Sequence, residues 1–279
     1  MPFATALQAR FHPLKTCVLL MSLAALTAAG YPQSSASSSS TPAPPPNYAA
    51  LPDILGIKPG MPAQQAYELL KAHSPKSKIV IGQYPMPGVS EKPVPTAMAV
   101  SVLDADPAEY VVLLLTPPPA KQVVWSVSRT FEMDRNKPLL TSKVLAGLRQ
   151  KYGPEVGERF WAFDEQGQRN ESVGPKGLNC PGRVIGLNVA GPNSMVTEVV
   201  SSLLSVPLAS TNPCYSFVAV SAVFNGPNPE YVFHVDVELT DWALGQRAQQ
   251  AYQAFVANAN AAKQKNELEK AKKRDGPVF

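Results

Sequence analysis

Three polar residues, His234, Asp236 and Glu238, alternate with apolar residues and form the most suggestive chemical pattern in the sequence. Alternation places all three on one face of a strand, where a His-x-Asp pair can offer two ligands to a metal ion. His73 is the only other histidine beyond residue 30, so no second histidine cluster completes such a site. We therefore favour the interpretation that the three residues form the solvent-exposed face of a half-buried strand.

The other titratable residues do not form a recognisable catalytic pattern. His73 lies at the end of a predicted helix, where it complements the helix dipole. Asp164 and Glu165 occupy a predicted turn, where nothing separates the pKa values of two carboxylates as acid–base catalysis requires. The sequence contains no phosphate-binding loop, dinucleotide fingerprint or zinc-protease motif. We expect no cofactor, no metal and no catalytic residue, although a triad assembled in space remains an alternative.

Cys180 and Cys214 are the only cysteines beyond residue 30, and we expect them to form a disulfide. An even pair of cysteines in an exported chain is typical of a structural bridge. Closing a loop of about 35 residues stabilises a fold by roughly 3–4 kcal/mol in the chain-entropy model. The alternative, a catalytic or metal-binding thiol, needs a nearby histidine or a Cys-x-x-Cys spacing, and the sequence shows neither.

Residues 1–30 have the pattern of a secretory signal peptide, because Arg10 and Lys15 precede the apolar run 17–26 and small residues follow it. The run is shorter than the roughly 20 residues that span a bilayer, so we expect cleavage near residue 30. An uncleaved anchor is the alternative. Residues 31–50 are rich in Ser and Pro and carry no charge, which predicts a flexible linker. These features predict a periplasmic or secreted protein.

Aromatic residues on predicted strands, Trp125, Phe160, Trp161 and Phe163, are candidates for contact with a partner. Within the strand at 159–163, alternation places Phe160 and Trp161 on opposite faces of the sheet. One of the two is then buried and the other is free to meet a partner. The alternative is a sheet covered on both sides, in which both rings belong to the core.

The folded part of the chain is predicted to begin with an amphipathic helix at 63–72, followed by several strands. A second helix starts after the capping candidates Thr141 and Ser142 and stops at Gly153, and further strands follow it. The predicted strands cover residues 78–84, 96–103, 109–116, 122–131, 159–163, 183–189, 216–224 and 231–239. The repeated order predicts an α+β fold with antiparallel sheets and a duplicated helix-plus-strands module. We assign the first α+β module to 51–154 and a second, β-rich module to 155–240.

Residues 241–279 predict a C-terminal helix with a basic tail. Its weak apolar stripe, Leu244, Ala248, Ala251 and Phe255, is expected to dock on the sheet through Phe255. Beyond it, residues 263–274 offer nothing to bury. They either contact an anionic envelope surface or form a solvated tail. The region 31–240 is nearly neutral, so we expect no nucleic-acid partner.

The stretch from Gly56 to Met61 leads into a short amphipathic helix, and 145–154 ends the second helix at Gly153 and Pro154. In these two places the chain resembles bacterial envelope modules of the SmpA/OmlA type, which begin and end a helix in a similar way. No matching Gly-Met turn precedes the second helix. These modules share their shape with the β-lactamase inhibitory proteins. The resemblance implies an α+β fold, an envelope location and a binding or scaffold role without catalytic residues.

From these features we expect an exported cell-envelope protein that acts as a non-catalytic binding or scaffold module. Its partner would be another envelope protein or cell-wall material, and no transmembrane span would remain after signal cleavage. One alternative is a secreted enzyme inhibitor or immunity-type protein. A hydrolase of an unrecognised family is the other, and it would need a cleft where a histidine, a serine and a buried carboxylate converge.

Overall fold

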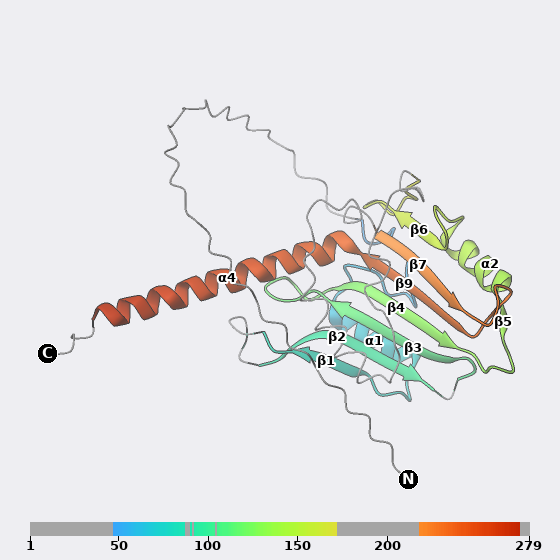
Figure 1. Cartoon of the computed structure of the whole chain (residues 1–279), viewed down its shortest axis with the longest axis horizontal. Coiled ribbons are helices and arrows are strands. Elements are labelled where there is room, and N and C mark those ends of the chain that lie inside the picture. The colour runs from blue at the N-terminus through green and yellow to red at the C-terminus, as the bar shows by residue number, and fades with distance from the viewer. Residues whose placement is uncertain (1–46, 87–89, 91, 104, 172–217, 274–279) are drawn as a thin grey trace, which may run out of the picture. The chain divides into compact units, whose positions relative to one another are not determined.

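The apolar and alternating runs of the sequence form one antiparallel sheet of seven strands (Figure 1). The computed structural model describes residues 47–86, 90, 92–103, 105–171 and 218–273. The strands of the large sheet are β1 (Val80–Tyr84), β2 (Val94–Val102), β3 (Ala108–Leu115), β4 (Val124–Glu132), β6 (Phe160–Phe163), β7 (Val218–Asn225) and β9 (His234–Asp241). Their spatial order is β1-β2-β3-β4-β9-β7-β6. Two short strands, β5 (Leu139–Leu140) and β8 (Tyr231–Val232), pair separately.

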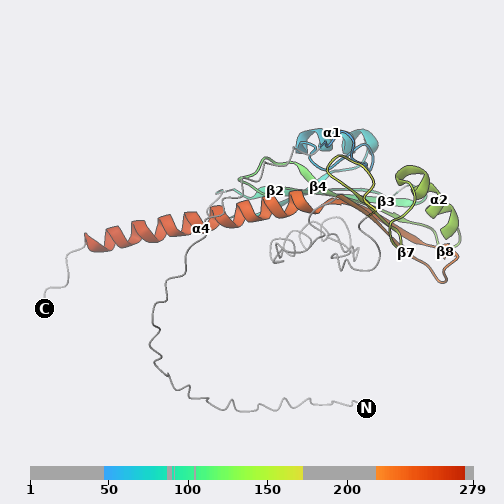
Figure 2. The same ribbon diagram turned by 90° about the horizontal axis from the view of Figure 1, so that it is seen from above.

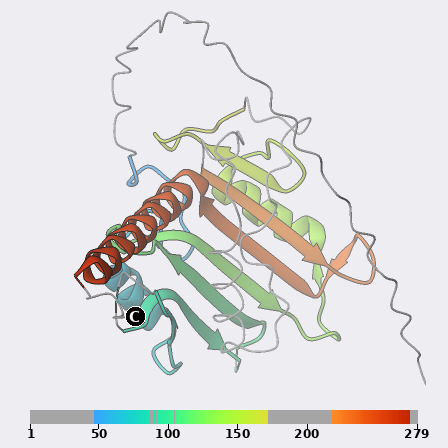
Figure 3. The ribbon, with the colours of Figure 1, turned by 60° about the vertical axis from the view of Figure 1, so that its left-hand side comes forward.

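The two halves of the described chain meet through their last strands. Helix α1 (Ala63–His73) precedes β1 to β4, and helix α2 (Thr141–Tyr152) precedes β6, β7 and β9. The last strand of each half, β4 and β9, pair antiparallel from Ser126–Thr240 to Glu132–His234, and Figure 3 shows them side by side. The structure thus confirms the α+β class, the antiparallel sheet and the repeated helix-plus-strands order. Strands from the ranges 51–154 and 155–240 share this one sheet.

Helices α1 and α2 lie on the same side of the sheet (Figure 2). Helix α1 buries Ala66 and Leu70 in a continuous apolar core that contains residues of both halves. Helix α2 buries only Tyr152 completely and leaves its other apolar residues partly exposed. The core is therefore closed more tightly under α1 than under α2.

The Gly56–Met61 segment connects the start of α1 to the sheet. The Gly60 amide donates to the Val124 carbonyl (2.8 Å), and the Val124 amide donates to the Met61 carbonyl (2.8 Å). Gly60 has a φ of +78°, and a Cβ there would lie 2.6 Å from the Tyr48 ring, so the position requires glycine. The residues that carry the likeness to envelope modules therefore have a clear structural role in this chain.

Strand β4 breaks the strict alternation that its sequence predicts. Leu114 pairs with Ser126, whereas Leu115 pairs with Val124, so β4 holds one extra residue at Trp125. This bulge places Val124 in the same core cluster as Val127, although strict alternation along a strand would place the two on opposite faces. The Trp125 ring instead contacts the Trp242 ring, with centroids 6.5 Å apart.

Helix α4 (Trp242–Lys272) follows β9 directly and is the predicted C-terminal helix. The Asp241 carboxylate caps it by accepting from the Leu244 amide (2.8 Å), and burial raises the pKa of this carboxyl. The helix docks through its first two turns, where Trp242, Gly245 and Ala248 are buried. Docking through Phe255 was a wrong prediction, because this side chain is 37% exposed.

The close approach of α4 to β4 at Gly245 explains which face of the helix is buried. A Cβ on Gly245 would lie 2.5 Å from Cε3 of the Trp125 ring, so only glycine lets the helix reach this position. The buried stripe continues through the half-buried Tyr252 and Val256. Phe255 lies about a quarter turn away from that stripe on a helix of 3.6 residues per turn, and it therefore faces solvent.

Among the described residues, no helix has both the length and the apolar character needed to cross a membrane.

We predict that Gly245→Ala destabilises the protein by about 1–3 kcal/mol, because the added methyl group overpacks the contact with Trp125. Gly147→Ala is the matched control: it also lies inside a helix, and a Cβ there meets nothing within 4 Å. That change should stabilise the fold by about 0.5–1 kcal/mol through helix propensity. Denaturant unfolding measures both effects, and an equal gain at the two positions would contradict the close contact.

Candidate functional site

The face of the sheet opposite α1 and α2 carries a buried row of polar side chains, called here the polar row. Its members come from the paired strands β4 and β9 and alternate with the core valines and leucine of those strands. All of them are at most 3% exposed. The polar row consists of Ser126, Ser128, Thr130, Asp236, Glu238 and Thr240.

Hydroxyl groups hold one oxygen of each carboxylate in the polar row. Asp236 Oδ1 accepts from Ser128 Oγ (2.8 Å) and from Thr130 Oγ1 (3.2 Å). Glu238 Oε1 accepts from Thr240 Oγ1 (2.8 Å) and from Ser126 Oγ (3.3 Å). These bonds offset part of the cost of removing two carboxyl groups from water.

The predicted solvent face of β9 is therefore wrong for its two carboxylates. Asp236 and Glu238 are 1% and 3% exposed, and one oxygen of each accepts from a serine hydroxyl of the neighbouring strand β4. Only His234, at the start of β9, is partly exposed, and its Nδ1 lies 3.9 Å from Glu132 Oε1. Within the described ranges, no three His, Cys, Asp or Glu side chains gather as a metal site would require.

The polar row contains one arrangement that resembles part of a catalytic pair. Ser128 donates to Asp236 as a nucleophile donates to its base. However, both side chains are almost completely buried, so a substrate has no access to them in this arrangement. The geometry therefore fits a polar layer within the fold rather than a reaction centre.

A second polar cluster joins the end of α1 to the sheet. His73 Nε2 lies 3.0 and 3.1 Å from the two oxygens of Glu109, and Arg129 Nε donates to Glu109 Oε1 (2.7 Å). The Arg129 guanidinium also stacks over the Phe131 ring at 4.5 Å from the centroid. His73 was predicted to complement the dipole of α1, and it does lie in the last turn of that helix. His73 also contacts Glu109, which lies 36 residues later in the chain. The periodicity of one helix could not predict a contact between such distant residues.

Three of the four aromatic candidates for partner contact are buried in the structure. Trp161 is fully buried, its indole nitrogen donates to the Gly153 carbonyl (2.8 Å), and its ring packs against Tyr152. Phe163 belongs to the same core cluster. Trp125 is covered by α4, and Phe160 is half-buried. The alternative interpretation, in which the sheet is covered and these rings belong to the core, holds for Trp161. The four rings therefore do not form an exposed contact surface.

Exposed apolar side chains lie instead on β5 and β8. Figure 1 shows β5 beside α2, and Figure 2 shows β8 beside the same helix. Leu140 pairs with Tyr231 across the two strands, and Leu139 precedes it. These three residues, called here the apolar corner, are 37–41% exposed. Val144 and Leu148 of α2 are also only half-buried. The sequence did not single out this surface, because two-residue strands leave too short a periodic signal.

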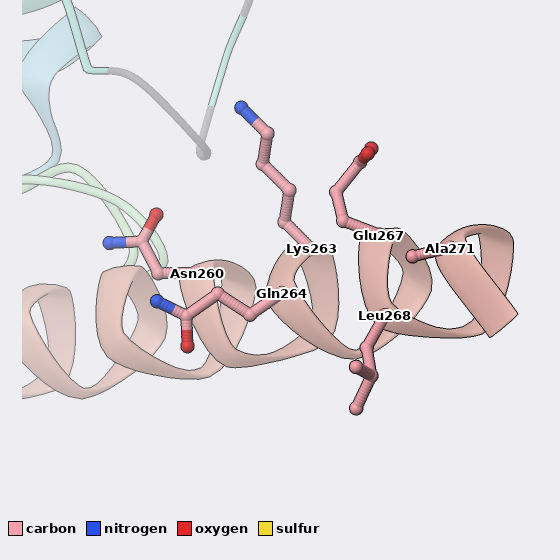
Figure 4. Close-up of a pocket in the computed structure, with 6 residues that line it drawn as sticks. All are labelled: Asn260, Lys263, Gln264, Glu267, Leu268 and Ala271. Atoms are coloured by element: carbon pink, nitrogen blue, oxygen red, sulfur yellow. The ribbon is translucent and has the colours of Figure 1, made fainter. Parts of the chain in front are cut away.

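The outer part of α4 is the other uncovered surface. Every residue from Asn260 to Lys273 is exposed. Figure 4 shows side chains that flank a shallow space along this part, and all of them come from successive turns of the one helix. The space is therefore a helix surface rather than an enclosed cavity.

Several sequence predictions lie outside the described residues. They are the signal peptide at 1–30, most of the linker at 31–50, the strand at 183–189 and the bridge between Cys180 and Cys214. They remain predictions.

We predict that Glu109→Gln destabilises the fold by about 1–3 kcal/mol, because it removes a nearly buried charge that accepts from Arg129 and contacts His73. Asp106→Asn is the control, since the Asp106–Lys137 pair is mostly exposed on both sides. It should leave the free energy of unfolding almost unchanged. Urea unfolding of both variants makes the comparison, and equal effects would mean that the Glu109 cluster behaves as a surface pair.

Comparisons of the chain with protein-family models, with curated proteins and with solved structures found no match. The likeness to SmpA/OmlA-type modules therefore rests on residues 56–61 and 145–154 alone.

Proposed function

We propose that this chain is an exported cell-envelope protein that acts as a non-catalytic binding or scaffold module. The observation that carries the proposal is the apolar corner, where Leu139, Leu140 and Tyr231 remain exposed beside the half-buried face of α2. Leu140 and Tyr231 are direct partners across β5 and β8, and exposed apolar side chains that lie together on a folded protein are typical of contact surfaces. Tyrosine is also among the residues that most often carry binding energy.

The distribution of polar groups supports binding rather than catalysis. The carboxylates best suited to chemistry, Asp236, Glu238 and Glu109, are buried and hold strands or helices together. A hydrolase needs a nucleophile and a base that converge where a substrate can reach them. The described surface offers apolar area and an uncovered helix, which suit recognition of another macromolecule.

Export is supported by the basic, apolar and small-residue order of residues 1–30, followed by the Ser/Pro-rich stretch. A partner in the envelope is then another envelope protein or cell-wall material. The apolar character of the corner favours a protein, because saccharide polymers are bound mainly through polar contacts and stacked rings. An inhibitor or immunity-type protein would use the same kind of surface against one enzyme.

We predict that Leu140→Ser combined with Tyr231→Ala weakens partner capture by about 2 kcal/mol or more, roughly thirtyfold in affinity. The matched control is Leu103→Ser, which removes a leucine that is 65% exposed outside the corner. Crosslinking to envelope extract, followed by mass spectrometry and titration with the purified partner, measures the effect. Equal retention of the partner by both variants, with folding intact, would contradict the role of the corner.

The same assay separates binding from catalysis. His234→Ala should leave partner capture unaltered, because this residue lies at the start of β9 and is not part of the corner. If this change abolishes the biological activity while the fold is intact, the protein is an enzyme and the proposal fails.

A further inference from the structure

In the described part of the chain, no buried side chain explains the length of the outer part of α4. The helix spans 31 residues, about 46 Å at 1.5 Å per residue, and its buried residues all lie between Trp242 and Gln249. From Asn260 onward every described side chain is exposed. A helix that is polar on all sides and uncovered is either held by its own charge pairs or has a partner elsewhere.

The charges of this part leave an excess of lysine. Residues 260–273 contain five lysines and two glutamates. The two glutamates are already paired within the helix, Glu267 with Lys270 (3.4 Å) and Glu269 with Lys272 (2.9 Å). Across the part of the chain that the structure describes, no ion pair involves the other three lysines, Lys263, Lys265 and Lys273.

One side of this helix combines lysine with an exposed apolar residue. Ala261, Lys265, Leu268 and Lys272 follow one another at steps of four and three, so they lie along one face. Leu268 is 56% exposed, and Figure 4 shows it pointing away from the side of Lys263 and Glu267. A single leucine is too little for a helix that inserts its apolar face into a bilayer, so any attraction to an anionic surface comes from the lysines.

We propose that the outer part of α4, Asn260–Lys273, docks on an anionic phospholipid surface through the ammonium groups of Lys263, Lys265 and Lys273, which contact lipid phosphates. The proposal deepens the proposed function, since it rests on an envelope location, but it concerns a surface separate from the apolar corner. Charge complementarity selects the occupant. Each lysine near such a surface contributes about as much as a weak hydrogen bond, so three or more are needed for measurable binding.

Cosedimentation of the full chain with lipid vesicles tests the proposal. Vesicles that contain phosphatidylglycerol should retain more protein than vesicles of phosphatidylcholine, which measure the contribution of the rest of the chain. The triple variant Lys263→Gln, Lys265→Gln and Lys273→Gln should lower the partition coefficient on the anionic vesicles about a hundredfold at low salt. Added salt should weaken the binding of the unaltered chain, because it screens exposed charges.

A control variant of equal charge separates position from net charge. Lys76→Gln, Lys92→Gln and Lys143→Gln together remove three exposed lysines from other parts of the fold and should leave vesicle binding nearly unchanged. All six lysines are exposed, so both variants should fold, and circular dichroism checks this. Equal loss in the two variants, or equal retention on the two kinds of vesicle, would overturn the proposal.

The same variants also distinguish a lipid partner of α4 from a protein partner. If the α4 variant keeps vesicle binding but loses a crosslinked acidic protein, the helix binds protein and the lipid proposal is wrong. The Leu140→Ser and Tyr231→Ala variant should keep vesicle binding, so a failure of the corner and a failure of the helix are observed separately.

Discussion

The pairing of β4 with β9 is the interaction on which the rest of the structure depends. It is the only contact between strands of the two halves in the seven-stranded order of the described residues, and it makes one sheet of them. One face of the pair is apolar, with Val127 opposite Leu239, and the other is the polar row. A slip of one residue would exchange these faces and place two carboxylates in the apolar core, which would cost several kcal/mol for each charge. The polar row thus holds the register of the strands that join the halves.

The need to satisfy buried carboxylates also bears on which residues are available to contact a partner. Buried carboxylates are costly unless they are satisfied, and here β4 supplies hydroxyl donors for Asp236 and Glu238. Glu109 is satisfied in the same way by His73 and Arg129. Because these groups hold elements together, the surfaces proposed for a partner are the apolar corner and the outer part of α4. The proposal of a binding module rests on this contrast between buried polar groups and exposed apolar or cationic side chains.

The sequence predicted the bounds of helices and strands well where the pattern of a single segment determines its secondary structure. The first helix, predicted at 63–72, covers Ala63–His73, and the apolar strand predicted at 109–116 covers Ala108–Leu115. The sequence-based prediction failed where contacts with a distant segment determine the local geometry or the exposure of a side chain. The bulge at Trp125 depends on the register with β3, and the burial of Asp236 depends on hydroxyls more than 100 residues away. The exposure of Phe255 depends on Gly245, which rotates the docked face of α4 toward Trp125.

Native-state hydrogen exchange of the backbone amides tests the central claim most directly, namely that β4 and β9 make the two halves one cooperative unit. The amides of Val127 and Val237, at the centre of the pair, should exchange only by global unfolding, with a free energy equal to that from denaturant unfolding. The amides of β3 and β7, on either side, should report the same value. If the strands β9, β7 and β6 instead open together at a lower free energy than β2 to β4, the halves are separate units and the account is wrong.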